Sequence, residues 1–411
     1  MKNKWTLLAF LCATFAIYTI DRALLGPLAI PIQNDTGITD VQFGILNGGI
    51  FWTFAFIVPF AGYAGDRLNR AKLIGFASIA WSVMVMLSGF ATGFWSLLLL
   101  VSFAVTAPQT LYAPSAFALL AARHKETRTV AFSCHQAAYY AGWFLSGAAV
   151  AVILWLFGSW RAAYFVMGAV GCLLGVAFLL SSRSGESSGS VAQAVENVNK
   201  PGVMEVVKAF FCCPSAVIAA LGHVAFTAVA FGYSAWGPKF VALKFDISAG
   251  AAGTGVMFWH FAASFVAVLL AGMATDRFVR KMPRFRLALQ SVSLLASAPM
   301  LIMFGYSPSL WMVWTVAALF GVTKGAFEAN SVNSIYDVMP ANCRSSAIGF
   351  LNVLTGVLGS LAPISLGWLS QHQGIAGLEK GFAAMGLVMV FFCGLMCVSL
   401  FHTFYKDRIT E

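Results

Sequence analysis

Residues 62–70 have the sequence GYAGDRLNR, and residues 272–280 have the sequence GMATDRFVR. The two segments share Gly, Asp, Arg and Arg at the same internal spacing, and each follows a long apolar block. Self-similarity of this kind indicates that the chain consists of two repeated halves. A second set of matches supports the repeat and pairs Val105, Thr106, Arg128 and Ala131 with Val322, Thr323, Arg344 and Ala347.

Apolar blocks surround these segments throughout the chain. Of 411 residues, 60% are hydrophobic and 10% are charged, whereas soluble domains contain about 25% charged residues. A bilayer core of about 30 Å requires about 20 apolar helical residues. Blocks of this kind lie near residues 5–30, 42–65, 73–92, 95–121, 130–157, 162–181, 210–238, 250–274, 285–305, 310–336, 345–371 and 380–404. The sequence therefore predicts an all-α membrane protein with twelve transmembrane helices, and not a β-barrel, whose strands would alternate.

A polar stretch rich in Ser, Gly, Glu and Asn divides the blocks into two sets of six. We expect an N-terminal six-helix half over residues 1–181, a cytoplasmic linker over 182–208 and a C-terminal six-helix half over 209–411. Alternating crossings place most of the 25 Lys and Arg residues on one side. The positive-inside rule assigns that side, and both termini, to the cytoplasm. The predicted location is the cell inner membrane.

Several kinds of chemistry lack support in the sequence. The net charge of +10 lies in short loops and does not indicate nucleic acid as a partner. The eight cysteines lack the paired spacings of a zinc site or a disulfide framework. Neither a phosphate-binding loop of the Walker type nor a nucleophile triad is visible. We therefore expect no catalytic residues, no metal, no cofactor and no enzyme activity.

The first repeated loop, with Gly62, Asp66, Arg67, Asn69, Arg70 and Lys72, resembles the loop signature of the major facilitator superfamily. Further residues resemble its Spinster and organic anion:cation symporter branches, namely Tyr18, Asp21, Arg22, Gly44, Leu46, Pro59, Trp236, Pro238 and Phe240. The resemblance implies two six-helix halves related by a parallel repeat, and secondary transport by alternating access. Ser102 and Gln109 stand where relatives carry Arg and Glu, so the usual proton acceptor on the fourth helix is absent.

Two charged residues, Asp21 and Arg22, lie inside the first apolar block. Charges within a membrane are costly and normally face the bundle interior, which makes them candidates for a functional site. Adjacent helical residues point about 100° apart. We therefore assign Arg22 to the cavity as the anchor of an anionic substrate, and Asp21 to proton coupling beside it. The alternative is a helix-to-helix ion pair that only fixes packing.

Lys324 and Glu328 form a second candidate site in the second half. Their i, i+4 spacing places both on one helix face, one turn apart. We expect Lys324 to bind substrate and Glu328 to supply the carboxylate for proton coupling. The alternative is an intrahelical pair that neutralises itself and does not contact substrate.

Polar and aromatic residues elsewhere are further candidates for substrate binding. They are Tyr18, Gln109, Tyr112, His135, Tyr139, Trp143, Tyr233, Trp236 and Asn352. Ordinary helix packing produces the same spacings.

The repeated loops suggest gates, because carboxylates at helix ends accept hydrogen bonds from backbone amides and Arg side chains. The expected gating residues are Asp66, Arg67, Arg70, Asp276, Arg277 and Arg280, together with Arg128 and Arg344. Setting the membrane topology is the alternative role for the basic members of this set.

Taken together, these features predict a secondary active transporter of a small organic anion, such as a carboxylate or sugar acid, coupled to protons. The rival prediction is an exporter of amphipathic or lysolipid-like compounds or drugs. A receptor is disfavoured because the loops are shorter than a domain, and an enzyme because the interior charges form two separate pairs. The expected partners are the solute, protons and membrane lipids, and the expected state is a monomer.

Overall fold

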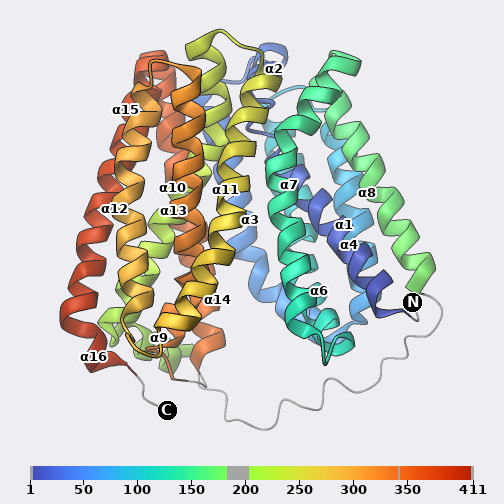
Figure 1. Ribbon diagram of the computed structural model, residues 1–411. Coiled ribbons are helices and arrows are strands. Elements are labelled where there is room, and N and C mark those ends of the chain that lie inside the picture. The colour runs from blue at the N-terminus through green and yellow to red at the C-terminus, as the bar shows by residue number, and fades with distance from the viewer. Residues whose placement is uncertain (1–2, 183–202, 341–342, 409–411) are drawn as a thin grey trace. The chain divides into compact units, whose positions relative to one another are not determined.

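The computed structural model describes residues 3–182, 203–340 and 343–408, and most of these residues are helical. In the first half the helices are α1 (Lys4–Ala23), α2 (Ala29–Thr36), α3 (Asp40–Arg67), α4 (Arg70–Ser88), α5 (Phe94–Leu97), the π-helical segment η1 (Leu98–Val105), α6 (Thr106–Arg123), α7 (Arg128–Phe157) and α8 (Trp160–Ser182). In the second half they are α9 (Val203–Phe211), α10 (Pro214–Phe245), α11 (Ala249–Phe278), α12 (Phe285–Tyr306), α13 (Leu310–Tyr336), α14 (Arg344–Gly359), α15 (Leu361–Val398), the π-helical segment η3 (Ser399–Thr403) and α16 (Phe404–Asp407). Figure 1 shows this arrangement.

Eleven helical stretches of the described residues are long and apolar enough to cross a membrane. The last, Ser346–Asp407, contains 62 residues and at 1.5 Å per residue would be about 93 Å long, three times the thickness of a bilayer core. Gly374 interrupts it with φ 59° and ψ −137°, a conformation that glycine adopts without strain. The stretch therefore makes two crossings. The prediction of an all-α membrane protein with twelve transmembrane helices is confirmed.

The first apolar block differs from the single helix expected over residues 5–30. Helix α1 ends at Ala23, a turn covers residues 24–28, and α2 then begins. Pro27 explains part of the break, because proline disfavours helical geometry in the residue before it. Within the turn, Gly26 allows a close approach to α10, since a Cβ atom there would lie 2.3 Å from the backbone oxygen of Ser234. The apolar character of Leu24, Leu25 and Leu28 conceals this turn in the sequence.

The chain divides into two compact units. Unit 1 comprises the described residues within Met1–Glu196 and Ser234–Phe258, and unit 2 those within Asn197–Tyr233 and Trp259–Glu411. Helices α10 and α11 therefore each contribute residues to both units. Of the linker expected over 182–208, residues 183–202 lie outside the described ranges, and residues 203–208 belong to α9.

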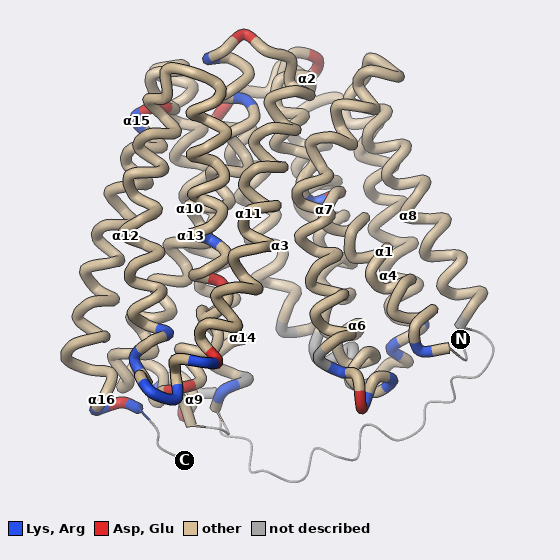
Figure 2. The backbone as a smooth tube through the Cα atoms, in the orientation of Figure 1, with Lys and Arg blue, Asp and Glu red and all other residues tan. Residues whose placement is uncertain are grey.

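Packing within the units repeats, as the sequence repeat leads us to expect. In unit 1, α4 packs against α8 and α6, and in unit 2, α12 packs against α15 and α13. Each unit also has a serine that bonds to a neighbouring helix backbone: Ser102 Oγ donates to Leu46 O at 2.7 Å, and Ser264 Oγ donates to Gly321 O at 2.8 Å. Figure 2 shows that charged residues gather at the helix ends and that few lie within the spans.

Candidate functional site

Asp21 and Arg22 occupy the last turn of α1, and their side chains face different neighbours. Arg22 Nη1 donates to the Tyr18 hydroxyl at 3.1 Å, and its guanidinium lies 5.5 Å from the ring centroid of Phe54 on α3. A cation at a helix C-terminus is favoured by the helix dipole. The structure thus places Arg22 on the side of α1 that faces α3.

Asp21 is 7% exposed, and its two carboxylate oxygens are buried without a hydrogen bond of full geometry within the described ranges. Its neighbours are Trp81 on α4 and Tyr164 on α8. The Trp81 Nε1 and Tyr164 hydroxyl atoms are also buried without a partner in the described part of the chain. A buried carboxylate that lacks a cation is costly when ionised. Asp21 therefore faces a buried polar pocket between α1, α4 and α8.

Buried aromatic residues fix α1 against α6 and α7 below this pair. The Tyr112 hydroxyl donates to Leu11 O at 2.7 Å and lies 3.0 Å from His135 Nε2. Because the hydroxyl has one proton, His135 Nε2–H is the donor in the second bond. The His135 ring stacks on Phe15 at 4.2 Å between centroids. These contacts orient the helix that carries Arg22.

The structure buries most of the other expected substrate-binding residues. Tyr18, Gln109, Tyr112, His135 and Trp143 lie in the interior of unit 1, each less than 9% exposed. Tyr139 and Asn352 are partly exposed. Trp236 is buried in unit 1 against Phe43, and Tyr233 is buried in unit 2 among His260, Phe304 and Phe320. In this state these buried residues contact protein and not solvent.

In unit 2, Lys324 and Glu328 of α13 form an ion pair with 2.7 Å between Nζ and Oε1. The lysine side chain is 6% exposed and the glutamate side chain 36%. The ammonium also lies 5.2 Å from the ring centroid of Phe261 on α11, and His223 of α10 lies within electrostatic range of Glu328. The cation is thus held in the interior, while its carboxylate partner reaches a more open environment.

Unit 2 also contains an apolar cavity of about 390 Å³. Its wall is made by side chains of α10, α14 and α15, among them Leu221, Val229, Leu358, Leu366 and Phe392. No residue of this wall is charged, and Ser365 is its one hydroxyl residue. Small-molecule cavities measure roughly 300–1,000 Å³, so the cavity is large enough to take an apolar group.

The structure describes six of the eight expected gating side chains. The side chains of Asp66 and Arg67 lie outside the described residues. Asp276, Arg277 and Arg280 are exposed and form no ion pair within the described ranges. Arg344 Nε donates to Tyr336 O, the last carbonyl of α13, and to Met339 O in the loop that follows, both at 3.2 Å.

Arg70 and Arg128 are the remaining two expected gating residues. Arg70 begins α4 and is partly exposed, and the Arg128 guanidinium lies 5.2 Å from the ring centroid of Phe132.

The sequence did not predict a polar network that lies near the C-terminal end of α10. Lys239 Nζ donates to Gln33 Oε1 at 2.6 Å and pairs with Asp40, and Gln33 Nε2 donates to Asp40 Oδ1 at 2.6 Å. We call Gln33, Asp40 and Lys239 the latch. The predicted membrane crossings place Lys239 near a helix end. They do not identify its partners, because residues about 200 positions apart share no periodic pattern in the sequence.

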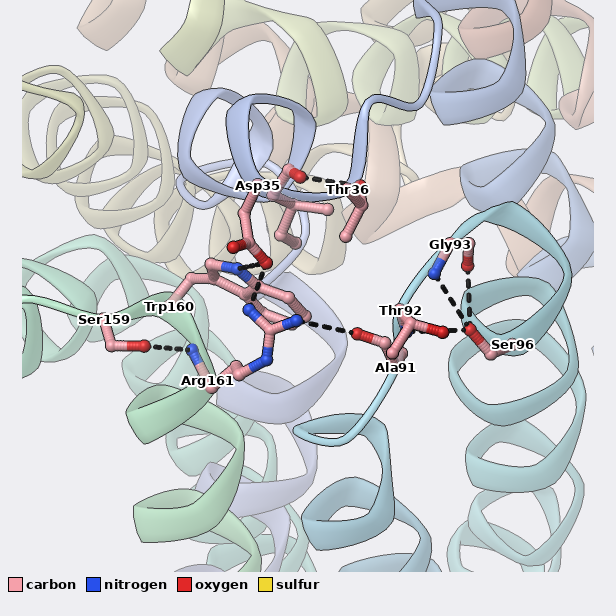
Figure 3. Close-up of polar contacts among 10 residues, drawn as sticks. Asp35, Thr36, Ala91, Thr92, Gly93, Ser96, Ser159, Trp160 and Arg161 are labelled. Atoms are coloured by element: carbon pink, nitrogen blue, oxygen red, sulfur yellow. Dashed lines mark hydrogen bonds and ion pairs between the residues drawn. The ribbon is translucent and has the colours of Figure 1, made fainter.

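A second missed cluster anchors α2, which carries Gln33 of the latch. Arg161 Nη1 and Trp160 Nε1 both donate to Asp35 Oδ2, the latter at 3.1 Å, and Arg161 Nη2 donates to Ala91 O at 3.1 Å (Figure 3). The hydrogen bonds from Arg161 and then Trp160 lower the pKa of the Asp35 carboxyl from its usual value. Asp35 therefore stays ionised and holds α2 to the start of α8.

Known proteins resemble the chain over its whole length. The MFS-type efflux pump of Mycolicibacterium smegmatis is 23% identical over 100% of this chain and 95% of its own length. The probable sulfoacetate transporter SauU of Cupriavidus necator is 24% identical over 95% of this chain and 94% of its own length. A crystal structure of a bacterial homolog of the human lysosomal transporter Spinster, inward-facing and unoccupied, has a TM-score of 0.86 and 21% identity, and each chain covers 100% of the other.

The sequence profile of one family matches residues 11–363, which is most of the chain and includes both repeated loops, 62–70 and 272–280. The expected resemblance to this family is confirmed, and transport, not enzymatic catalysis, is the activity that the family and the relatives share. The protein is a multi-pass membrane transporter and belongs to the Major Facilitator Superfamily.

Proposed function

We propose that the protein transports a small organic anion across the cell inner membrane by alternating access, coupled to protons. The observation that carries this proposal is the ion pair of Lys324 with Glu328, in which a buried ammonium is matched by a more exposed carboxylate. Net charge inside a membrane is costly, so a cation kept there requires an anion beside it at all times. A substrate carboxylate or sulfonate meets that requirement as well as Glu328 does.

The pair suggests a specific exchange. The substrate anion takes the place of Glu328 at the Lys324 ammonium, and the released Glu328 binds a proton. The charge within unit 2 is then unchanged when substrate and proton travel together. Arg22 is the corresponding cation of unit 1, and the Asp21 pocket is the corresponding proton site. The relative named for sulfoacetate, a small organic anion, supports this substrate class.

The latch fits the alternating-access cycle. The ends of the two repeats separate on one side of the membrane at a time. All three latch residues lie in unit 1, but in sequence α10 begins the second repeat while α2 and α3 belong to the first. We therefore expect the latch to break when that side opens. The basic loops at the other ends of the helices favour a cytoplasmic location for those ends and for both termini.

Glu328→Gln tests the proposal in proteoliposomes with a panel of radiolabelled sugar acids and sulfonates. We expect the variant to keep exchange of internal for external substrate, because neither direction of exchange requires net proton movement. We expect it to lose accumulation driven by a pH gradient. Thermal stabilisation by the same panel first identifies a bound anion, since a ligand stabilises the state it binds. Full pH-driven accumulation by Glu328→Gln would move the coupling role to Asp21, and a panel without any binding anion would refute the substrate class.

The apolar cavity of unit 2 favours a second candidate function, the export of amphipathic or lysolipid-like compounds. A wall without charge suits an alkyl chain and not a carboxylate. Lysolipids in the same stabilisation assay separate the two functions. Replacing Ala228 of the wall with Phe is expected to abolish a response to lysolipids while leaving a response to sugar acids intact.

A further inference from the structure

Basic and apolar side chains meet on the surface of unit 2 where α11 ends, α12 begins and α16 lies. The basic members are Arg277, Arg280, Lys281, Arg284, Lys406 and Arg408, and the apolar and aromatic members are Phe278, Met282 and Tyr405. We call these nine residues the basic corner. Figure 2 shows Lys and Arg gathered at this end of α12 and at α16.

The apolar members of the basic corner are exposed in spite of their size. Phe278 is 46% exposed, Met282 51% and Tyr405 56%. Phe278 is also the last residue of α11, which is one of the membrane-crossing helices. Exposed apolar residues among cations at the end of a crossing helix are the pattern of a surface that enters the interfacial region of a bilayer.

The corner is held in a fixed shape from two sides. The Arg284 guanidinium lies 4.0 Å from the ring centroid of Tyr405. The segment that carries Tyr405 is tied to the start of α10, where Asp407 accepts from Ser215 N at 2.9 Å and Thr403 Oγ1 lies 2.6 Å from Ser215 Oγ.

The loop on the other side is a tight turn. The carbonyl of Phe278 accepts from the backbone amides of Lys281 at 3.1 Å and Met282 at 2.9 Å. The cations are therefore presented by ordered backbone on both sides of the corner.

Within the described part of the chain, no ion pair joins the cations of the corner to a carboxylate. Arg286, just beyond the corner, pairs with Asp337, and Asp407 is engaged at Ser215. Among the described residues, Lys281, Arg284 and Lys406 have no carboxylate partner, and the buried Arg284 Nε has no hydrogen-bond acceptor. The corner therefore offers N–H donors and positive charge for which the described residues supply no carboxylate acceptor. An anion would supply it.

We propose that the basic corner binds the phosphate headgroup of an anionic phospholipid, with Phe278, Met282 and Tyr405 against the first carbons of the acyl chains. Clusters of four to eight Lys and Arg beside a transmembrane helix attract anionic lipids. The guanidinium of Arg284, oriented by the Tyr405 ring, provides a fork that matches phosphate oxygens. A basic loop that serves topology alone needs neither the stacked arginine nor the exposed aromatic residues.

The test compares two pairs of exposed lysines in the full chain purified in a neutral detergent. Lys281→Gln/Lys406→Gln removes two charges from the corner, and Lys125→Gln/Lys380→Gln removes two charges elsewhere. Phosphatidylglycerol, phosphatidylcholine and inorganic phosphate are titrated separately, with thermal unfolding and lipid retention in native mass spectrometry as readouts. Each basic residue near an anionic surface contributes on the order of fivefold to binding, so the first variant should bind phosphatidylglycerol about 25-fold more weakly and the control variant should match the wild type.

Arg284→Gln is the second variant, and it should weaken phosphatidylglycerol binding even though Lys281 and Lys406 remain. Equal binding of phosphatidylglycerol by the wild type and both corner variants would overturn the proposal. Equal weakening by the control pair would also overturn it, because binding would then follow overall charge. Stabilisation by inorganic phosphate that depends on Lys281 and Lys406 while phosphatidylglycerol has no effect would assign the corner to a soluble phosphate and overturn the lipid as its ligand.

Discussion

Removal of the latch lysine should shift the protein toward the state in which the latched end is open. In Lys239→Gln, Asp40 keeps the hydrogen bond from Gln33 and loses the ion pair with the Lys239 ammonium. Without the Lys239 ammonium, the Asp40 carboxylate is stabilised more by hydration in the open state than by burial in the closed state. The variant therefore weakens the closed arrangement of α2, α3 and α10 specifically.

The magnitude follows from the burial of the pair. The Lys239 and Asp40 side chains are 10% and 17% exposed, so solvent screens them only in part. Removing one member of a fully buried pair costs about 3–5 kcal/mol, whereas an exposed pair contributes at most about 1 kcal/mol. The remaining Gln33 donor and the partial exposure put Lys239→Gln at about 2 kcal/mol. At 1.4 kcal/mol per factor of ten, the ratio of open to closed protein should rise about 30-fold.

Distances between spin labels measure this ratio directly. Thr39 and the 43%-exposed Leu243 lie near the latch and accept labels after substitution by cysteine, once the exposed native Cys134 and Cys212 are replaced by serine. Lys239→Gln should add a longer distance to the distribution, and Asp40→Asn should do so less strongly.

The double variant provides the decisive comparison. Lys239→Gln with Asp40→Asn should shift the ratio less than the sum of the two single effects, because both changes remove the same ion pair. Unchanged distributions in Lys239→Gln, or strictly additive shifts in the double variant, would refute the latch.

Three further predictions concern the anchor, the aromatic support of α1 and the fixing of α2. Arg22→Ala should abolish binding of an anionic substrate in the thermal-shift assay without loss of folded protein, and Arg22→Lys should restore part of it; unchanged binding in Arg22→Ala would remove the anchor. Tyr112→Phe leaves the buried Nε2–H of His135 without an acceptor and should lower stability by about 1–3 kcal/mol, whereas Tyr306→Phe, at an exposed tyrosine, should have no effect on thermal unfolding. The lowered pKa of Asp35 means that its ion pair stabilises the fold fully above about pH 4 and that this contribution fades as pH falls further; Asp35→Asn should lower the melting temperature at pH 7 and by less at pH 3, and an equal loss at both would contradict the assignment.

The lengths of the apolar blocks predict most of the fold, because the thickness of the bilayer core sets the length of each crossing helix. The membrane crossings follow from these block lengths. The turn at Gly374 lies in the gap expected between the blocks that end at residue 371 and begin at residue 380. The break after Ala23 does not follow, since Leu24, Leu25 and Leu28 continue the apolar pattern through a turn. Pro27 disfavours helical geometry before it, and the close approach at Gly26 brings the turn against Ser234; hydropathy carries no information about either.

The candidate site divides along the same line. Helical geometry alone leads to the divergence of Asp21 from Arg22 and to the contact of Lys324 with Glu328, since both depend on residues one to four positions apart. The latch and the Asp35 cluster join residues more than 120 positions apart, and only the folded chain brings them together. The roles of the buried aromatic residues in substrate binding stay predictions.

Glycine at two positions brings helices into backbone contact around the latched end. A Cβ at Gly26 would lie 2.3 Å from Ser234 O, and a Cβ at Gly147 would lie 2.3 Å from Gly253 O. Every amino-acid-changing point mutation in a glycine codon introduces a Cβ atom. A single amino-acid substitution at either site therefore forces the two backbones apart, and a homologue without glycine there must pack these helices differently.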